Sequence, residues 1–299
     1  KGLKLHTHNI TAVVTVADDG GSSGILRSDL GMLAPGDVRN CVSALAEVDP
    51  VMGELLNFRF KDGSLKGHSL GNLFLAALNE TSSSFDEAVK KFSHLTGVVG
   101  AVYPVTNESV TLSALLEDGR LIEGESHIGV HHDGPKNGIV KPKAVDGVIK
   151  ALEKADIIVL GPGSLYTSII PNLLVDGVVD AIKKSNAVKI YVCNIMSQAG
   201  ETENYTVSDH LAAIERHSYE GIADIVIANN AIIPESLRIK YASEHAREVM
   251  IDSINVLKRA KLVQGNLLLV RNDKIRHNFS RLARTIMRLG SDVNYFENK

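Results

Sequence analysis

The stretch TVADDGGSSG, residues 15–24, places two carboxylates among glycines and serines directly after an apolar run at 10–16. Carboxylates bind divalent cations or the hydroxyl groups of a sugar. Glycine lets a ligand approach the backbone closely, and the N–H groups of such a loop bind anionic oxygens. Surface turns use the same residue types, but the combination favours a phosphorylated ligand. The candidate residues are Asp18, Asp19, Gly20, Gly21, Ser22 and Ser23.

Three further polar segments follow apolar runs, and they begin at Gly161, Asn194 and Asn229. Ligands of open α/β sheets bind at the carboxyl ends of the strands, so four such loops predict one shared crevice. The hydroxyl groups of residues 161–168, GPGSLYTS, suit a phosphate at a helix start, although Ser164 or Thr167 can equally serve only to cap that helix. The candidates in these segments are Gly161, Gly163, Ser164, Thr167, Asn194, Gln198, Glu201 and Asn229.

The segment PGDVRN, residues 35–40, places Pro and Gly ahead of an apolar-periodic stretch and so indicates the start of a helix. We interpret Asp37 as the N-cap of that helix. Arg39 and Asn40 can face the crevice, and the guanidinium group of Arg39 suits a phosphate.

The segment GHSLG, residues 67–71, matches the G-x-S-x-G pattern of a serine nucleophile. That motif needs a buried strand before the serine, and residues 61–66 predict none. Ser69 is therefore discarded as the nucleophile of a hydrolase, and we interpret His68, Ser69 and Asn72 as a helix start that lines a pocket. The run His131-His132-Asp133 is interpreted as a solvated loop, because sequence neighbours point in different directions.

Composition excludes several classes of function. The 299 residues carry a net charge of −3, with 5% aromatic residues and no Trp, so neither a basic field nor a stacking surface for nucleic acid is present. Only two cysteines occur, far apart in sequence, which disfavours a disulfide framework and favours the reducing cytoplasm. No apolar run reaches the ~18 residues of a membrane span, and the N-terminus lacks the apolar centre of a signal peptide.

Strand-like and helix-like stretches alternate in the second half. Strands are predicted at 155–160, 188–194, 224–229 and 266–270, and helices at 175–184 and from about Ser208. This order predicts a Rossmann-like, doubly wound, mostly parallel sheet with helices on both faces. Two regions depart from it. Residues 60–80 read as mainly helical, and residues 98–130 as a β insertion with a hairpin turn at Glu117–Arg120.

Five segments together resemble the gluconeogenesis factors of the YvcK type, in the CofD-like superfamily that includes 2-phospho-L-lactate transferases. They are TVADDGGSSGILR, PGDVRN, GHSLGNLFLAAL, GPGSLYTSIIPNLL and YVCNIMSQAGETENYTVSDH. The resemblance implies one Rossmann-like domain over residues 1–299, UDP-sugar binding, and a cytoplasmic role in cell shape and growth on gluconeogenic carbon sources. It also implies a first strand and a glycine-rich turn of GGGTG type ahead of Lys1, which this sequence lacks.

The resemblance also assigns roles to single residues. Similarity to the transferases implies that Asp18 and Asp19 hold Mg²⁺ against a diphosphate, and no other cofactor is expected. Tyr241 is suited to contact the nucleotide sugar by stacking and Arg276 by charge, although both can equally lie on an exposed surface.

Two functions remain open. The first is a nucleotide-sugar sensor that acts on a regulatory protein partner. A homodimer is also expected, because dimers are the commonest oligomers of soluble proteins. The second is a transferase that moves a phosphorylated group from a nucleotide-diphosphate donor to a hydroxyl acceptor, oriented by Asn194, Gln198 or His210. No general base with activating neighbours stands out in the sequence, which favours the sensor.

Overall fold

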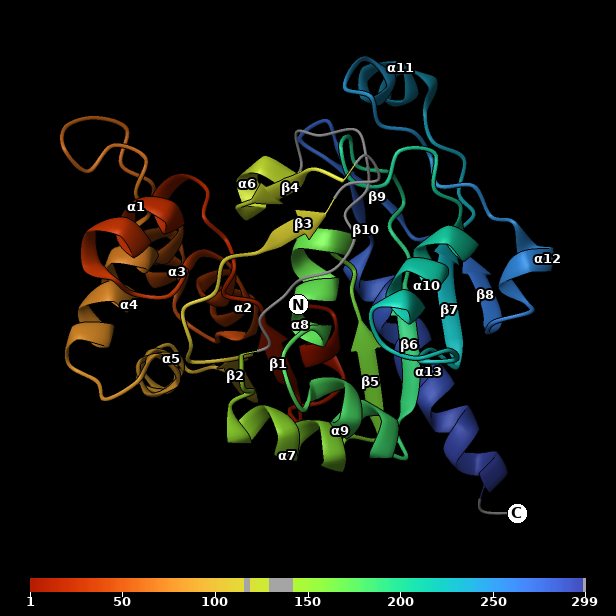
Figure 1. Ribbon diagram of the computed structural model, residues 1–299, viewed down its shortest axis with the longest axis horizontal. Coiled ribbons are helices and arrows are strands. Elements are labelled where there is room, and N and C mark those ends of the chain that lie inside the picture. The colour runs from red at the N-terminus through yellow and green to blue at the C-terminus, as the bar shows by residue number, and fades with distance from the viewer. Residues whose placement is uncertain (116–118, 129–141, 298–299) are drawn as a thin grey trace.

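A parallel four-stranded sheet forms the centre of the computed structural model, which describes residues 1–115, 119–128 and 142–297 (Figure 1). Its order is β5-β6-β7-β8. Both faces of such a sheet are covered, so its strands are nearly continuous apolar runs, and all five residues of β7 are buried. The strands are β5 Ile157–Leu160, β6 Val188–Val192, β7 Ile225–Asn229 and β8 Lys261–Gly265.

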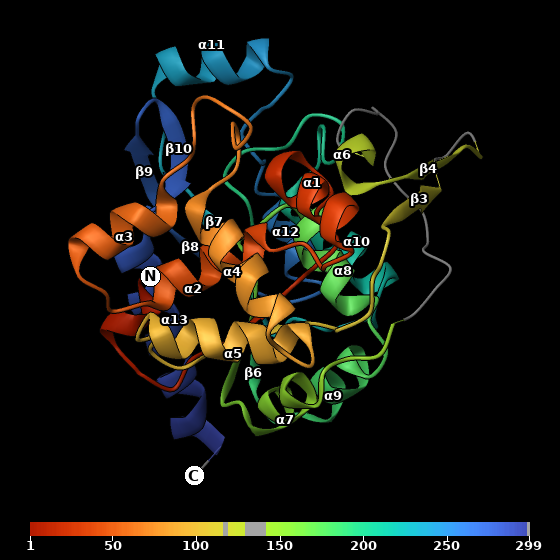
Figure 2. The same cartoon turned by 90° about the vertical axis from the view of Figure 1, so that its left-hand side faces the viewer.

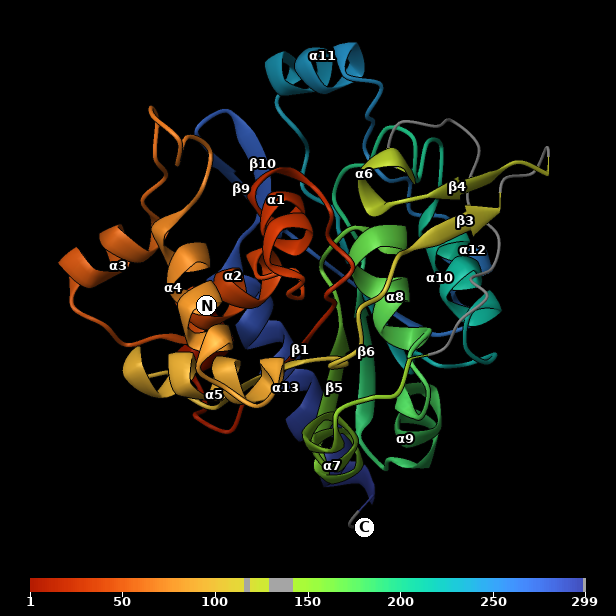
Figure 3. The same cartoon turned by 60° about the vertical axis from the view of Figure 1, so that its left-hand side comes forward.

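A second parallel pair stands beside β5. Strand β1, Thr11–Val14, pairs in register with β2, Ala101–Pro104. Val13 packs against the same hydrophobic core as β5, although no hydrogen-bonded ladder joins the pair to β5 within the described ranges. Figures 1 and 3 show β1 alongside β5, so the parallel layer consists of two hydrogen-bonded pieces.

Helices cover both faces of the central sheet. On one face Tyr191 and Val226 pack with α7, Asp146–Lys154, α9, Val178–Lys184, and α10, Val207–Arg216. On the other face the alternate residues of β6 and β7 pack against α13, Phe279–Glu297, through Leu282 and Ile286 among others. This arrangement confirms the predicted doubly wound α/β fold.

Five helices between β1 and β2 form a layer with its own core of Val38, Leu75, Phe92 and their neighbours (Figure 2). Residues 60–80 were predicted to be mainly helical, which is wrong for the first ten: the helix begins only at Leu70. Gly63 and Gly67 have φ of +72° and +88°, a conformation that ends a helix. The five helices are α1 Gly21–Leu30, α2 Gly36–Leu45, α3 Pro50–Asn57, α4 Leu70–Glu80 and α5 Phe85–Leu95.

The β region at 98–130 divides between two structures. Strand β2 belongs to the parallel pair, whereas β3, Ser113–Leu115, and β4, Leu121–Glu123, form the small antiparallel hairpin that was predicted. Residues 117 and 118 of the expected turn lie outside the described residues, as does the run His131-His132-Asp133. The hairpin leads into the short helix α6, Glu125–Ile128.

The strand predicted at 266–270 was expected to belong to the parallel sheet, but it lies in a separate hairpin. Strand β9, Leu268–Arg271, forms an antiparallel hairpin with β10, Lys274–His277, while β8 completes the parallel sheet. The remaining short elements are η1 Leu3–Leu5, η2 Leu165–Ile169, α8 Ile170–Leu173, α11 Glu235–Ser243 and α12 Ser253–Val256. Of the helices that the described residues form, none is long and apolar enough to cross a bilayer.

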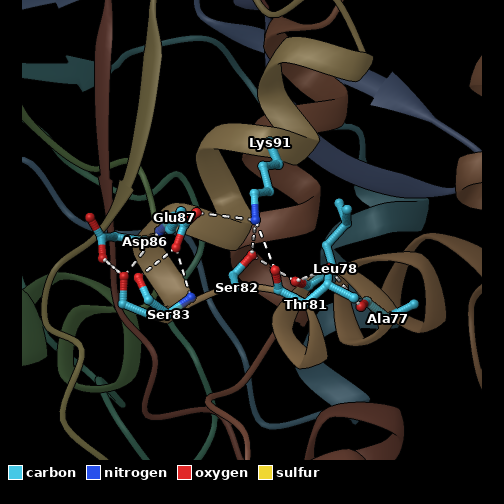
Figure 4. Close-up of polar contacts among 9 residues, drawn as sticks. Ala77, Leu78, Thr81, Ser82, Ser83, Asp86, Glu87 and Lys91 are labelled. Carbon is cyan, nitrogen blue, oxygen red and sulfur yellow. Dashed lines mark hydrogen bonds and ion pairs between the residues drawn. The ribbon is translucent and has the colours of Figure 1, made fainter.

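A polar clasp closes the turn between α4 and α5 (Figure 4). Lys91 Nζ donates to the Thr81 carbonyl at 2.9 Å and lies 3.1 Å from Glu87 Oε1. The backbone N–H of Ser83 donates to Glu87 Oε2 at 2.7 Å. Hydrogen bonds from Ser83 and, next, from Lys91 lower the pKa of Glu87 from 4.5 to about 2.

We expect Glu87→Gln to lower the melting temperature near neutral pH, because the variant loses the ionised acceptor. The folded pKa lies below the unfolded one, so this stabilisation is present above the unfolded pKa and disappears as pH falls toward about 2. Calorimetry of both proteins from about pH 7 to about pH 3 measures the difference, which should narrow on acidification. Glu80→Gln, on the exposed surface of α4, is the control. A difference in melting temperature between Glu87→Gln and the unmodified protein that did not change with pH would contradict the stabilising role of ionised Glu87.

Candidate functional site

The acidic loop between β1 and α1 is held by its own backbone and by one arginine. The N–H of Gly20 donates to Asp18 Oδ1 at 2.9 Å. Arg27 Nη1 donates to the carbonyls of Ala17 and Asp18, both at 3.1 Å, and Arg27 Nη2 donates to the Val110 carbonyl at 2.7 Å. The guanidinium group therefore ties this loop to the segment that leads into the β3-β4 hairpin.

Four carboxylates gather around this loop. Burial raises the pKa of Asp37, and the charge of Asp18 raises it further. Burial also raises the pKa of Glu125 to about 7; a hydrogen bond with Thr167 opposes the shift, and the charges of Asp18, Asp19 and Asp37 add to it. A Cβ on Gly124 would lie 2.6 Å from Asp19 Oδ2. The β3-β4 hairpin thus places Glu125 close to the acidic loop that contains Asp18 and Asp19.

Sequence reasoning missed Glu125, because no motif marks a single glutamate at the end of a hairpin. The prediction that Asp37 is an N-cap is wrong: Pro35 occupies that position, and no side-chain hydrogen bond caps α2 among the described residues. Asp37 hydrogen-bonds Asn40, which is exposed.

A buried polar chain links the N-terminal turns of α1, α2 and α4. Ser22 Oγ lies 3.0 Å from His68 Nδ1 and accepts from Asn72 Nδ2 at 3.1 Å. Arg39 Nε donates to Asn72 Oδ1 at 3.3 Å, and Arg39 Nη1 donates to Asn57 Oδ1 at 2.9 Å. The structure therefore brings together three predicted segments through contacts between residues up to 50 positions apart.

Arg39 forms no ion pair within the described ranges, although the charge of Asp37 acts on it. The residue is 7% exposed, and its guanidinium group donates to two neutral amides, those of Asn72 and Asn57. Burial lowers its pKa. Helix N-termini attract anions, and the described parts of α1 and α2 show no side-chain cap. The arrangement is suited to an external anion.

Ser69 caps helix α4, and its predicted part in lining a pocket stays a prediction. Its side chain is 1% exposed and accepts from the Asn72 N–H at 3.2 Å, which caps α4. A nucleophile must be reachable, so this geometry agrees with discarding the hydrolase.

The second group of predicted residues surrounds the loop after β5. Ser164 Oγ donates to the buried carboxylate of Glu201, and it accepts from Thr167 N–H at 3.1 Å and from Thr167 Oγ1 at 2.6 Å. Burial raises the pKa of Glu201, while the hydrogen bond from Ser164 opposes that shift. Ser164 caps the turn at 165–169, so the hydroxyl that was predicted to bind a ligand has this capping role in the structure.

Asn194 and Glu125 connect the loops. Asn194 Nδ2 donates to the Gly163 carbonyl at 2.8 Å and to Gln198 Oε1 at 3.3 Å. The hydrogen bond between Glu125 and Thr167 then joins the loop after β5 to the carboxylates of the first loop. A hollow of about 370 Å³ adjoins Asp19 and Arg27. A larger hollow of about 690 Å³ lies against α10 and contains none of the predicted residues.

Four other predicted residues lie outside the two groups described above. Asn229 Oδ1 accepts from Leu267 N–H at 2.9 Å, and Tyr241 Oη accepts from Ile275 N–H at 2.9 Å. Arg276 is exposed on β10. His210 is completely buried, with Nδ1 2.8 Å from the Thr206 carbonyl, so it is not available to an acceptor.

The proximity of α2 to α4 depends on Gly71. A Cβ there would lie 2.6 Å from the Leu56 carbonyl oxygen and 2.9 Å from Arg39 Cδ. We expect Gly71→Ala to destabilise the fold by about 2 kcal/mol, because the backbone oxygen cannot move away cheaply. Gly53→Ala is the matched control: its Cβ would meet only Val48 Cγ2, at 3.8 Å, and should raise stability by up to ~1 kcal/mol. Urea denaturation measures both, and equal effects would contradict this packing.

The chain matches the family 2-phospho-L-lactate transferase CofD over residues 1–269. It is 43% identical to the gluconeogenesis factor of Bacillus subtilis strain 168 over 295 residues, which are 97% of this chain and 93% of that protein. It is also 43% identical to a crystal structure of a UPF0052 family member from Bacillus halodurans, with a TM-score of 0.92 over 95% of this chain and 94% of that one. The chain therefore belongs to the CofD family, among its gluconeogenesis factors.

Proposed function

We propose that this site binds a nucleotide sugar of the UDP-sugar class, with the diphosphate beside Arg39 and the helix N-termini. The observation that carries the proposal is a guanidinium group that is 7% exposed and donates to two amides, with no ion pair among the described residues. A buried charge is costly unless it is paired, and a diphosphate bound there would add its negative charge to that of Asp37. Arginine binds phosphate oxygens in a bidentate manner.

The carboxylates next to this position suit the rest of such a ligand. Asp18 and Asp19 can accept hydrogen bonds from sugar hydroxyls or hold Mg²⁺ against the diphosphate. The described residues contain no group of three or more His, Cys, Asp or Glu side chains able to hold a metal ion by themselves. Mg²⁺ is commonly held by one or two carboxylates together with substrate phosphates, so the residues present fit a cation that arrives with the ligand.

The biological role that we propose follows the family name. Relatives are gluconeogenesis factors, and we propose that this protein senses a nucleotide sugar in the cytoplasm and passes the signal to a regulatory protein partner. In that role it supports cell-shape maintenance and growth on gluconeogenic carbon sources.

One observation supports a transferase as the second candidate. Glu125, whose pKa is about 7, can accept a proton from an acceptor hydroxyl at neutral pH. The hydroxyl oxygen would then attack the phosphorus of a nucleotide-diphosphate donor, and the bond to the leaving nucleotide would break. The match to a family of transferases agrees with this chemistry.

Calorimetric titration with UDP-N-acetylglucosamine, with and without Mg²⁺, tests the binding proposal. We expect Arg39→Gln to weaken binding by about ten- to a hundredfold, since hydrogen bonds to charged groups contribute about 1.5–3 kcal/mol. Arg288→Gln, an exposed position on α13, is the control. An unmodified protein that does not bind overturns the proposal, and unchanged affinity in Arg39→Gln removes Arg39 from the site.

Chromatography of the same mixture after prolonged incubation separates the two candidates. An intact nucleotide sugar supports a sensor. Release of UMP or UDP only when a hydroxyl acceptor is present supports the transferase, and Glu125→Gln should then slow release without weakening donor binding.

A further inference from the structure

Helix α3 exposes its apolar side instead of burying it. Of its eight residues only Leu56 is buried. Val51 is 63% exposed, Met52 46% and Leu55 44%, and Phe58, directly after the helix, is 46% exposed. Val51, Leu55 and Phe58 are spaced at i, i+4 and i+7, so they lie on one face. We call these four residues the α3 face.

The size of the α3 face matches the centre of a protein interface. Large apolar side chains present about 150–250 Å² each when fully exposed, so the four expose roughly 400 Å² together. A dimer of standard size buries about 800 Å² per partner, of which about two thirds is apolar. The α3 face thus supplies most of the apolar area that such a dimer needs, and its polar surroundings supply the rim.

Charges around α3 identify the partner as a second copy of this chain. Glu47 and Asp49 precede the helix, and Arg59, Lys61 and Asp62 follow it, so the end carries a net positive charge; all five are exposed. When two copies of α3 pair in antiparallel orientation, the acidic start of each meets the basic end of the other, and the two helix dipoles also oppose. A two-fold axis produces this self-complementary contact.

We propose that the protein forms a two-fold symmetric dimer through the α3 face, with α3 antiparallel to its copy. Val51 then lies opposite Phe58 of the second copy, with Leu55 beside the axis and Met52 nearer the end. The proposal does not rest on nucleotide-sugar binding, and the sedimentation test uses the chain without ligand. Figure 2 shows α3 at the edge of the molecule, where no other element covers its outer side.

Sedimentation equilibrium of the purified chain over a range of concentrations tests the dimer. We expect a dimer at micromolar concentration, and Leu55→Glu should weaken it at least about tenfold, as loss of a central interface contact does. Ile254→Glu is the matched control, because Ile254 is 78% exposed on α12. Far-UV circular dichroism must stay unchanged in both variants, which shows that each is folded. A monomer at every concentration, or a dimer that Leu55→Glu leaves intact, overturns the proposal.

A charge exchange tests the orientation. Glu47→Lys should weaken the dimer, because it places like charges together at both ends of the interface. Adding Lys61→Glu to the same chain should restore the affinity, since each end again pairs opposite charges. If the double variant loses as much dimer affinity as Glu47→Lys and Lys61→Glu lose together as single variants, the antiparallel arrangement is wrong.

Discussion

The hydrogen bonds of one buried cation hold the N-terminal layer together. Arg39 reaches Asn72 on α4 and Asn57 at the end of α3, and Asn72 in turn holds Ser22 on α1. A buried guanidinium group is costly without opposite charge, yet here it donates to amides. Gly71 brings the neighbouring helices close enough for these bonds. The charge of Asp37 acts on the group, and a ligand with further negative charge would stabilise it more, which is the basis of the proposed site.

The hairpin between the parallel pair and the central sheet connects the two halves of the site. Arg27 anchors the segment before the hairpin through the Val110 carbonyl, and Glu125 after the hairpin meets both Thr167 and the aspartates. Negative and positive charges therefore occupy different parts of the site. The carboxylates lie together beside the hairpin, and the guanidinium group of Arg39 lies among the helices of the N-terminal layer. A nucleotide sugar combines hydroxyls with a diphosphate, so the proposed ligand has groups suited to both kinds of surroundings.

Much of this arrangement could be predicted from the sequence, because long apolar runs and glycine-bearing loops have local causes. The strand of β7 and the loops at Asp18 and Ser164 are of this kind. Other features depend on contacts between distant residues. Strand β8 escaped prediction because Leu262 and Val263 are its only strongly apolar residues, and sheet pairing decides its state. Glu125 acquires its shifted pKa only from burial and from charges that the fold brings near. Aspartate is a common N-cap residue, which is why Asp37 was expected to cap α2, but Pro35 occupies the N-cap position.

The proposed interface and the proposed ligand site share an element, which has a thermodynamic consequence. Helix α3 carries the apolar face along its length and ends at Asn57, whose side chain accepts from Arg39. If the proposed diphosphate drew the guanidinium group away from Asn57, the last turn of α3 beside Phe58 would lose that hydrogen bond. Any free energy that couples ligand binding to dimerisation acts equally in both directions: the factor by which the ligand changes the dimer affinity is the factor by which dimerisation changes the ligand affinity. A sensor needs such a coupling to turn occupancy into a signal, and in this fold the Arg39–Asn57 hydrogen bond is the shortest physical route for it.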